Sequence, residues 1–186
     1  TPNLRRLVLP KTGEFSREGL NLAMRSWSGL ESITLTSVVP GHLIFPAIRK
    51  YCKNIVEMKY SCGCMLTEKH AEAMIKYTPK LKVLSIQSIP ASVKPLCSLV
   101  TFLTHLEVVN ICHTILVDES ADVNDNFDFR DLQNLLPPSS FGKLIYCQGG
   151  WCLRCKNFWQ DTDLIGQPHG AWENTWREDE IPSLSH

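Results

Sequence analysis

The sequence has 186 residues, of which 44% are hydrophobic, and this is enough for one domain with a continuous core. Its 19 basic and 19 acidic residues give a formal net charge of zero, which argues against electrostatic attraction to nucleic acid or to a membrane surface. Because we find neither a membrane-spanning apolar stretch nor a secretory signal, we expect a cytoplasmic or nuclear protein.

Five copies of one apolar pattern follow one another at steps of 26, 25, 26 and 25 residues. The copies are Leu4-x-x-Leu7-x-Leu9, Leu30-x-x-Ile33-x-Leu35, Ile55-x-x-Met58-x-Tyr60, Leu81-x-x-Leu84-x-Ile86 and Leu106-x-x-Val109-x-Ile111. A fixed period in the range of about 20–29 residues with this core is typical of leucine-rich repeats. The pattern therefore predicts an α/β solenoid, an open arc with short parallel strands on the concave side and helices on the convex side.

The segment before each of the last four of these strands carries residues that are apolar, except for Thr78, at ten, seven and three positions ahead of the first strand anchor. This spacing places them on one face of a helix. The predicted helix residues are Leu20, Ala23 and Trp27; Phe45, Ile48 and Cys52; Ala71, Met74 and Thr78; and Leu96, Leu99 and Leu103. Ser16 and Thr67 are expected N-caps, and Pro46 and Pro95 are expected in first helical turns, where a missing N–H costs little.

Between the inward anchors, alternate strand residues should face the concave side. Three columns result: Arg6, Ser32, Glu57, Val83 and Val108; Val8, Thr34, Lys59, Ser85 and Asn110; and Pro10, Thr36, Ser61, Gln87 and Cys112. The columns change from charged in the early repeats to apolar and small polar in the later ones. This composition suits a protein or peptide partner, and it lacks the basic stripe that nucleic-acid binding requires.

A degenerate sixth repeat is expected at Phe141-x-x-Leu144-x-Tyr146, whose anchor follows Leu106 by 35 residues. This interval is longer than the repeat period, and the extra residues fall in 113–128. That segment is acidic and poor in apolar side chains, so we expect a loop insertion there. We assign residues 1–147 to the leucine-rich-repeat domain. Residues 148–186, which contain several Trp and Cys residues, should form an irregular C-terminal cap and tail.

Two interpretations remain for the cysteines near the end of the chain. Cys147, Cys152, Cys155 and His169 could complete a tetrahedral zinc site, because Cys-x2-Cys is half of a zinc knuckle. The poorly formed second half favours instead a structural cap in which Trp151, Phe158 and Trp159 cover the last repeat. The earlier Cys52, Cys97 and Cys112 fall at packing positions and are expected to be reduced thiols.

The sequence does not indicate catalysis. No pattern places a histidine beside a thiol as a nucleophile would need, and no glycine-rich phosphate loop is present. We therefore expect a binding protein without an enzymatic activity or a cofactor.

The repeats, including Pro79-Lys80-Leu81-Lys82-Val83-Leu84, resemble those of F-box/leucine-rich-repeat proteins. The similarity is greatest to a plant type with a Trp-rich tail, here Trp151–Lys156 and Trp172–Asp179. The resemblance implies an N-terminal F-box that binds the Skp adaptor of a cullin-based (SCF) ubiquitin ligase, and repeats that capture the protein substrate for ubiquitination. The F-box itself is missing from this chain, which opens two residues before its first repeat anchor, so we expect the C-terminal part of a longer protein.

Two other functions remain open. The chain could be an interaction scaffold unrelated to ubiquitin, or a small-molecule sensor, although a sensor would need a closed ring of repeats. We expect instead that the chain is a substrate-recognition region that binds protein on its concave face.

Overall fold

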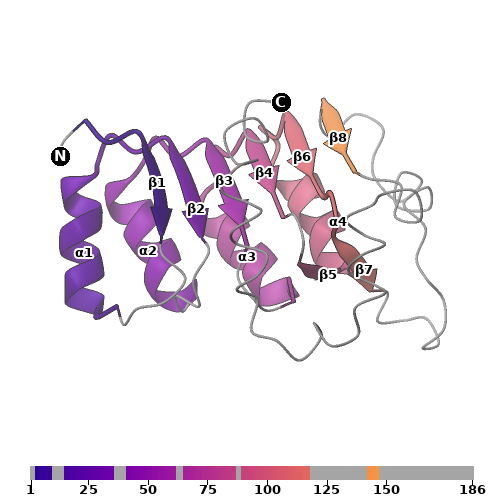
Figure 1. The fold of residues 1–186 in the computed structure, drawn as a ribbon, viewed down its shortest axis with the longest axis horizontal. Helices are drawn as coiled ribbons and strands as arrows, with labels where there is room; N and C mark the ends of the chain where they lie inside the picture. Colours follow the sequence, from indigo (N-terminus) through magenta and orange to yellow (C-terminus); the bar gives the residue numbers. More distant parts are fainter. Residues whose placement is uncertain are drawn as a thin grey trace.

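The computed structural model describes residues 3–9, 15–35, 41–61, 65–86, 89–117 and 142–146. Within these ranges, six parallel strands form one sheet in the order β1-β2-β3-β4-β6-β8, and helices follow one another in a row beside it (Figure 1). The strands of this sheet are β1 (Arg6–Leu9), β2 (Ser32–Leu35), β3 (Glu57–Tyr60), β4 (Val83–Ser85), β6 (Val108–Asn110) and β8 (Lys143–Ile145). The helices are α1 (Arg17–Ser26), α2 (Gly41–Tyr51), α3 (Glu68–Tyr77) and α4 (Val93–Phe102). The expected α/β class is confirmed.

The register of the sheet matches the register of the sequence repeats. The middle anchor of each repeat pairs with the middle anchor of the next, giving one row of Leu7, Ile33, Met58, Leu84, Val109 and Leu144. The row includes Leu144, so the strand of the degenerate sixth repeat is confirmed. Residues 118–141, which precede this strand, lie outside the described residues.

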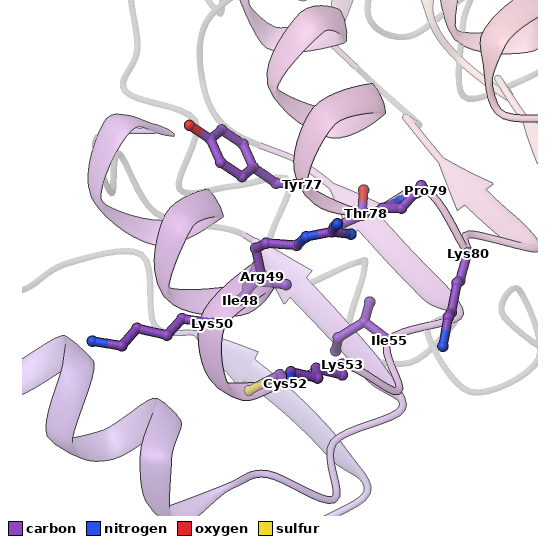
Figure 2. A pocket seen from close by; sticks show the side chains of 10 residues that line it. All are labelled: Ile48, Arg49, Lys50, Cys52, Lys53, Ile55, Tyr77, Thr78, Pro79 and Lys80. Atoms are coloured by element: carbon purple, nitrogen blue, oxygen red, sulfur yellow. The ribbon is translucent and has the colours of Figure 1, made fainter.

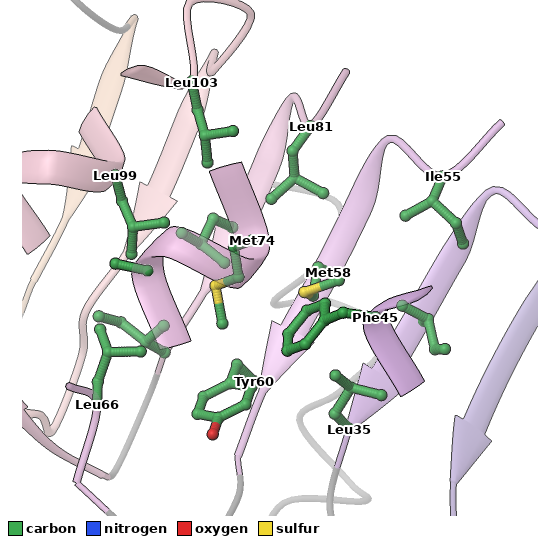
Figure 3. Packing of buried hydrophobic residues seen from close by; sticks show 14 of the residues in the cluster. Leu35, Phe45, Ile55, Met58, Tyr60, Leu66, Met74, Leu81, Leu99 and Leu103 are labelled. Carbon is green, nitrogen blue, oxygen red and sulfur yellow. The ribbon is translucent and has the colours of Figure 1, made fainter. Parts of the chain in front are cut away.

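The strand anchors form the core, as expected. In repeats two to five all three anchors are at most 3% exposed, whereas Leu4 and Leu7 of the first repeat are partly buried. Figure 3 shows anchors such as Met58 and Tyr60 pointing toward the helix residues Phe45 and Met74. Since full burial of one large apolar side chain contributes about 1.5–3 kcal/mol, this continuous row of contacts is the main stabilising feature of the fold.

The predicted helix faces are buried against these anchors. Leu20, Phe45, Ala71 and Leu96 are at most 3% exposed, while Ala23 and Trp27 of α1 remain half-buried. The only polar member of the predicted set is Thr78, and its hydroxyl donates a hydrogen bond to the Met74 carbonyl oxygen at 2.7 Å. This bond compensates for the burial of the hydroxyl.

The predicted helix starts are confirmed at three of four positions. Ser16 and Thr67 are the N-caps of α1 and α3, and Pro95 lies in the first turn of α4. The prediction for Pro46 is wrong, because α2 begins at Gly41 and Pro46 is its sixth residue. The earlier start buries Ile44 and Phe45, and this packing offsets the one backbone hydrogen bond that the proline removes in the middle of the helix.

A second, two-stranded sheet was not predicted. It pairs β5 (Pro90–Ser92) with β7 (Ile115–Val117), and Leu66 forms an isolated bridge with Ala91. Ile115–Val117 fall in the expected loop insertion, which is therefore a strand at this point; residues 118–128 of the insertion lie outside the described residues. His113, with a φ of 61°, makes the left-handed turn that leads from β6 into β7.

The C-terminal region 147–186, including the predicted cap, lies outside the described residues. Among the helices that are described, none combines the length and the hydrophobicity that crossing a bilayer would require.

Candidate protein-binding surface

The sheet face opposite the helices carries the columns that were predicted to bind a partner. The first column is confirmed as a row of paired residues, and it continues onto the sixth strand: Arg6, Ser32, Glu57, Val83, Val108 and Lys143. Its ends are exposed at Arg6 and Lys143, its centre is half-buried, and Ser32 is buried at 4% exposure. This column therefore offers accessible side chains on every strand of the sheet except β2.

Charge and hydrophobicity change along the first column. The Arg6 Nη2 and Glu57 Oε2 atoms lie 3.4 Å apart, so an ion pair spans the shorter Ser32 between them. The next two positions, Val83 and Val108, are apolar and half-buried. The surface thus combines a paired charge at one end with an apolar stretch toward the other.

The residues just before the strands carry further ion pairs. Arg5 pairs with Glu31, and the Lys82 Nζ and Glu107 Oε1 atoms lie 2.6 Å apart. All four side chains are well exposed, so each pair contributes only about 0–1 kcal/mol to stability. Their main effect is to neutralise the charge along this border of the sheet.

The second column differs from the expectation of an open, solvated strand face. Val8 is 42% exposed, but Thr34, Lys59, Ser85 and Asn110 are at most 3% exposed. Lys59 pairs with Thr34 on one side and with Ser85 on the other, and it is itself only 1% exposed, so the centre of this column is closed to solvent. Lys59 has an interaction partner, which makes the burial of its ammonium group tolerable.

Several polar groups on this face are buried without a hydrogen bond. The hydroxyls of Ser32, Thr34 and Ser85 have no partner in the described part of the chain. The Asn110 side chain is satisfied, because its Oδ1 atom accepts a hydrogen bond from the Cys112 backbone N–H at 3.0 Å. An unpaired buried hydroxyl costs about 1–3 kcal/mol. In the described part of the chain, the centre of this face therefore holds small polar side chains that reduce stability because their hydrogen bonds are not made.

The third column is described only in part. Ser61 and Cys112 are half-buried, and Pro10, Thr36 and Gln87 lie outside the described residues. The partner-binding role assigned to the three columns is not tested by the geometry and stays a prediction.

The predicted zinc ligands Cys147, Cys152, Cys155 and His169 also lie outside the described residues. In the described ranges, no three or more His, Cys, Asp or Glu side chains gather as metal ligands would. Cys52, Cys97 and Cys112 are free thiols. The zinc hypothesis is therefore untested.

Sequence reasoning missed a cleft of about 540 Å³ between the C-terminal ends of α2 and α3 (Figure 2). Its lining includes four basic residues, namely Arg49, Lys50, Lys53 and Lys80. The cleft lies between two consecutive repeats, so a search within single repeats could not find it. The available signal was the run of cations that precedes β3 and β4.

One relative supports the resemblance seen in the repeats. The chain is 29% identical over 187 residues to an F-box/LRR-repeat protein of Arabidopsis thaliana, and the match covers 98% of this chain. The chain spans 60% of the length of that relative. No protein-family model matches the sequence. The similarity to an F-box/LRR-repeat protein is thereby confirmed.

Proposed function

We propose that this chain is the substrate-recognition region of an F-box/leucine-rich-repeat subunit of an SCF-type ubiquitin ligase. The observation that carries the proposal is the match to an F-box/LRR-repeat protein along nearly the whole chain. In this proposal the chain binds a protein substrate and performs no chemistry itself. The Skp adaptor and the cullin bind through an F-box outside this chain.

We also propose that the strand–helix units form a leucine-rich-repeat solenoid. Support comes from strands β1 to β4, β6 and β8, which pair in chain order with equivalent anchors side by side. Each of the helices α1 to α4 contacts the next one along the chain. A unit that touches only its neighbours is the characteristic arrangement of such repeats.

The substrate surface in this proposal is the accessible part of the sheet face opposite the helices. Arg6, Val8 and Glu57 supply one exposed and partly charged end, and Val83 and Val108 supply an apolar centre. Apolar positions beside charged ones suit a polypeptide partner, because the apolar contact gives affinity and the charges select the register.

The decisive test is affinity purification of the tagged full-length protein from its own cells, followed by mass spectrometry. We expect the Skp adaptor and the cullin to be recovered together with a ubiquitinated protein. Recovery of a stable partner without adaptor or cullin would overturn the ligase role and would favour an interaction scaffold.

A paired variant tests the surface. Val83→Arg introduces a charge on the half-buried outer face of β4, so we expect substrate recovery to fall at least tenfold while adaptor recovery is unchanged. Leu22→Arg is the matched control, because Leu22 is 69% exposed on α1 and away from the sheet face. Equal recovery of the substrate by both variants would place the binding surface elsewhere.

A further inference from the structure

The cleft between α2 and α3 has an apolar lining and a basic border. The exposed Pro79 and the half-buried ring of Tyr77 provide the accessible apolar surface, whereas the lining residues Ile48 and Ile55 are at most 3% exposed. Figure 2 shows Arg49 extending from α2 toward Thr78 and Pro79, with Lys53 and Lys80 on the two turns that lead into β3 and β4. Lys50 points away from this group in the same view. An occupant would thus meet apolar surface inside and three cations around it.

These cations differ from those at the border of the sheet. Arg5, Arg6 and Lys82 each pair with a glutamate, whereas no carboxylate lines the cleft and no described carboxylate pairs with Arg49, Lys53 or Lys80. All three side chains are exposed. Among the described residues, the cleft is therefore a local concentration of positive charge without carboxylate partners, in a chain whose net charge is zero.

Compensation of the helix dipole explains only part of this charge. Cations near a helix C-terminus interact favourably with the partial negative charge there, and Arg49 lies in the last turn of α2. Lys53 and Lys80 lie beyond the helix ends, in the turns that follow α2 and α3. The dipole effect falls off within the last turn, so these two lysines need another explanation.

We propose that the cleft docks an acidic segment of a partner polypeptide, with its carboxylates on Arg49, Lys53 and Lys80 and an apolar side chain against Tyr77 and Pro79. Charge complementarity identifies the occupant as anionic, and the apolar lining identifies it as one that also carries hydrophobic side chains. The cleft lies apart from the sheet face, so this proposal does not depend on the substrate surface.

A phosphate-bearing occupant fits less well. Phosphate sites use backbone N–H groups at helix N-termini, whereas this cleft lies at two helix C-termini, whose carbonyl groups repel a concentrated anion. Carboxylates spread along a peptide distribute their charge over the three cations instead. Nucleic acid would require a basic stripe much longer than one cleft.

The test uses a fluorescent twelve-residue peptide in which glutamates alternate with leucines, and its anisotropy is measured with the full chain. We expect saturable binding that weakens as salt rises, because the contacts are ionic. Arg49→Glu combined with Lys53→Glu should lower the affinity at least tenfold. Arg17→Glu with Lys69→Glu is the matched control, with the same charge change at exposed helix N-termini, and it should change the affinity less than twofold.

Amide chemical shifts locate the bound peptide. Shifts confined to residues 48–55 and 77–80 support the proposal, and shifts centred on the sheet face contradict it. Equal weakening by the two double variants would mean nonspecific attraction and would also contradict it. Tighter binding of inositol hexakisphosphate or of single-stranded RNA to the same residues would overturn the peptide assignment. Val83→Arg should leave peptide binding unchanged, which separates this site from the substrate surface.

Discussion

At the scale of single residues, Cys52 shows how a thiol can serve the packing of two repeats. Its Sγ lies 3.5 Å from the carbonyl oxygens of Met24 and Trp27, at the end of α1, and its side chain is 2% exposed. The thiol can therefore add a weak hydrogen bond to carbonyl oxygens that already accept from the Trp27 and Leu30 backbone N–H groups. Burial raises the pKa of Cys52 to about 11.

The raised pKa predicts both low reactivity and a dependence of stability on alkaline pH. An unfolded thiol ionises near its ordinary pKa of 9.0, while the native thiol keeps its proton to about 11, so stability is lost as pH rises through this interval. We expect a loss on the order of 2–3 kcal/mol in the free energy of unfolding. Urea denaturation at pH 8 and pH 10.5 measures it, and Cys52→Ala should show a smaller loss.

Alkylation provides an independent check of Cys52. With iodoacetamide at pH 8, peptide mapping should find Cys52 unmodified in the native protein and modified after denaturation. Rapid labelling of native Cys52 would contradict the burial that raises its pKa.

His70 replaces the usual glutamate at the start of α3. The Thr67 backbone N–H donates to His70 Nδ1 at 3.1 Å, and the Thr67 hydroxyl lies 2.9 Å from the same nitrogen. Only the neutral imidazole can accept at Nδ1. Burial lowers the pKa of His70, which also favours the neutral form.

Acid should therefore destabilise this helix start. Because the pKa of His70 is lower in the folded protein than its ordinary value of 6.5, the unfolded chain takes up the proton first, and stability is lost as pH falls below about 6.5. His70→Gln keeps an acceptor at this position without a titrating group. Thermal melts at pH 7.5 and 5.5 should show a smaller decrease for the variant. Identical decreases would mean that His70 does not carry this pH dependence.

At the scale of elements, β4 separates core from surface within two adjacent residues. Leu84 is 0% exposed and points into the helix-covered core, while Val83 is half-buried on the other face. Leu84→Ala should cost about 2–5 kcal/mol, as a cavity in a packed core does. Val83→Ala should cost about 1 kcal/mol, because it removes a partly exposed group. Chemical denaturation of the two variants measures the difference, and equal losses would contradict the strand register.

The strands and helices were predictable because their signal repeats. Anchor residues recur at a fixed step, so Met58 and Tyr60 could be assigned to the core although neither is a leucine. The same reasoning could have found the second sheet, since Leu66, Ala91 and Leu116 are also 25 residues apart. They were missed because a single apolar residue before a helix cap is a weak signal without its equivalents in other repeats.

Features that depend on neighbouring elements could not be predicted in this way. A two-residue alternation placed Thr34, Lys59 and Ser85 on an open strand face, and it could not show that all three are at most 1% exposed. Pro46 was misplaced because the start of α2 is decided by the packing of Phe45. The basic cleft arises only when two helix ends come together in space.

At the scale of the whole molecule, the described strand–helix units form two separate surfaces that we propose bind partners. The sheet face opposite the helices has paired charges and apolar positions, and the basic cleft has unpaired cations around an apolar lining. Because the two regions differ in chemistry, the two proposals together predict that two polypeptides bind without competition.

The local nature of the contacts between units has a consequence for diversification. Within the described residues, each strand–helix unit contributes one strand to the large sheet and packs mainly against the units on either side, as α2 meets α1 and α3. Mutations in one strand can therefore alter which molecules are recognised there while distant strands keep their shape. If the sheet binds partners as proposed, its specificity can therefore evolve through substitutions in one repeat at a time.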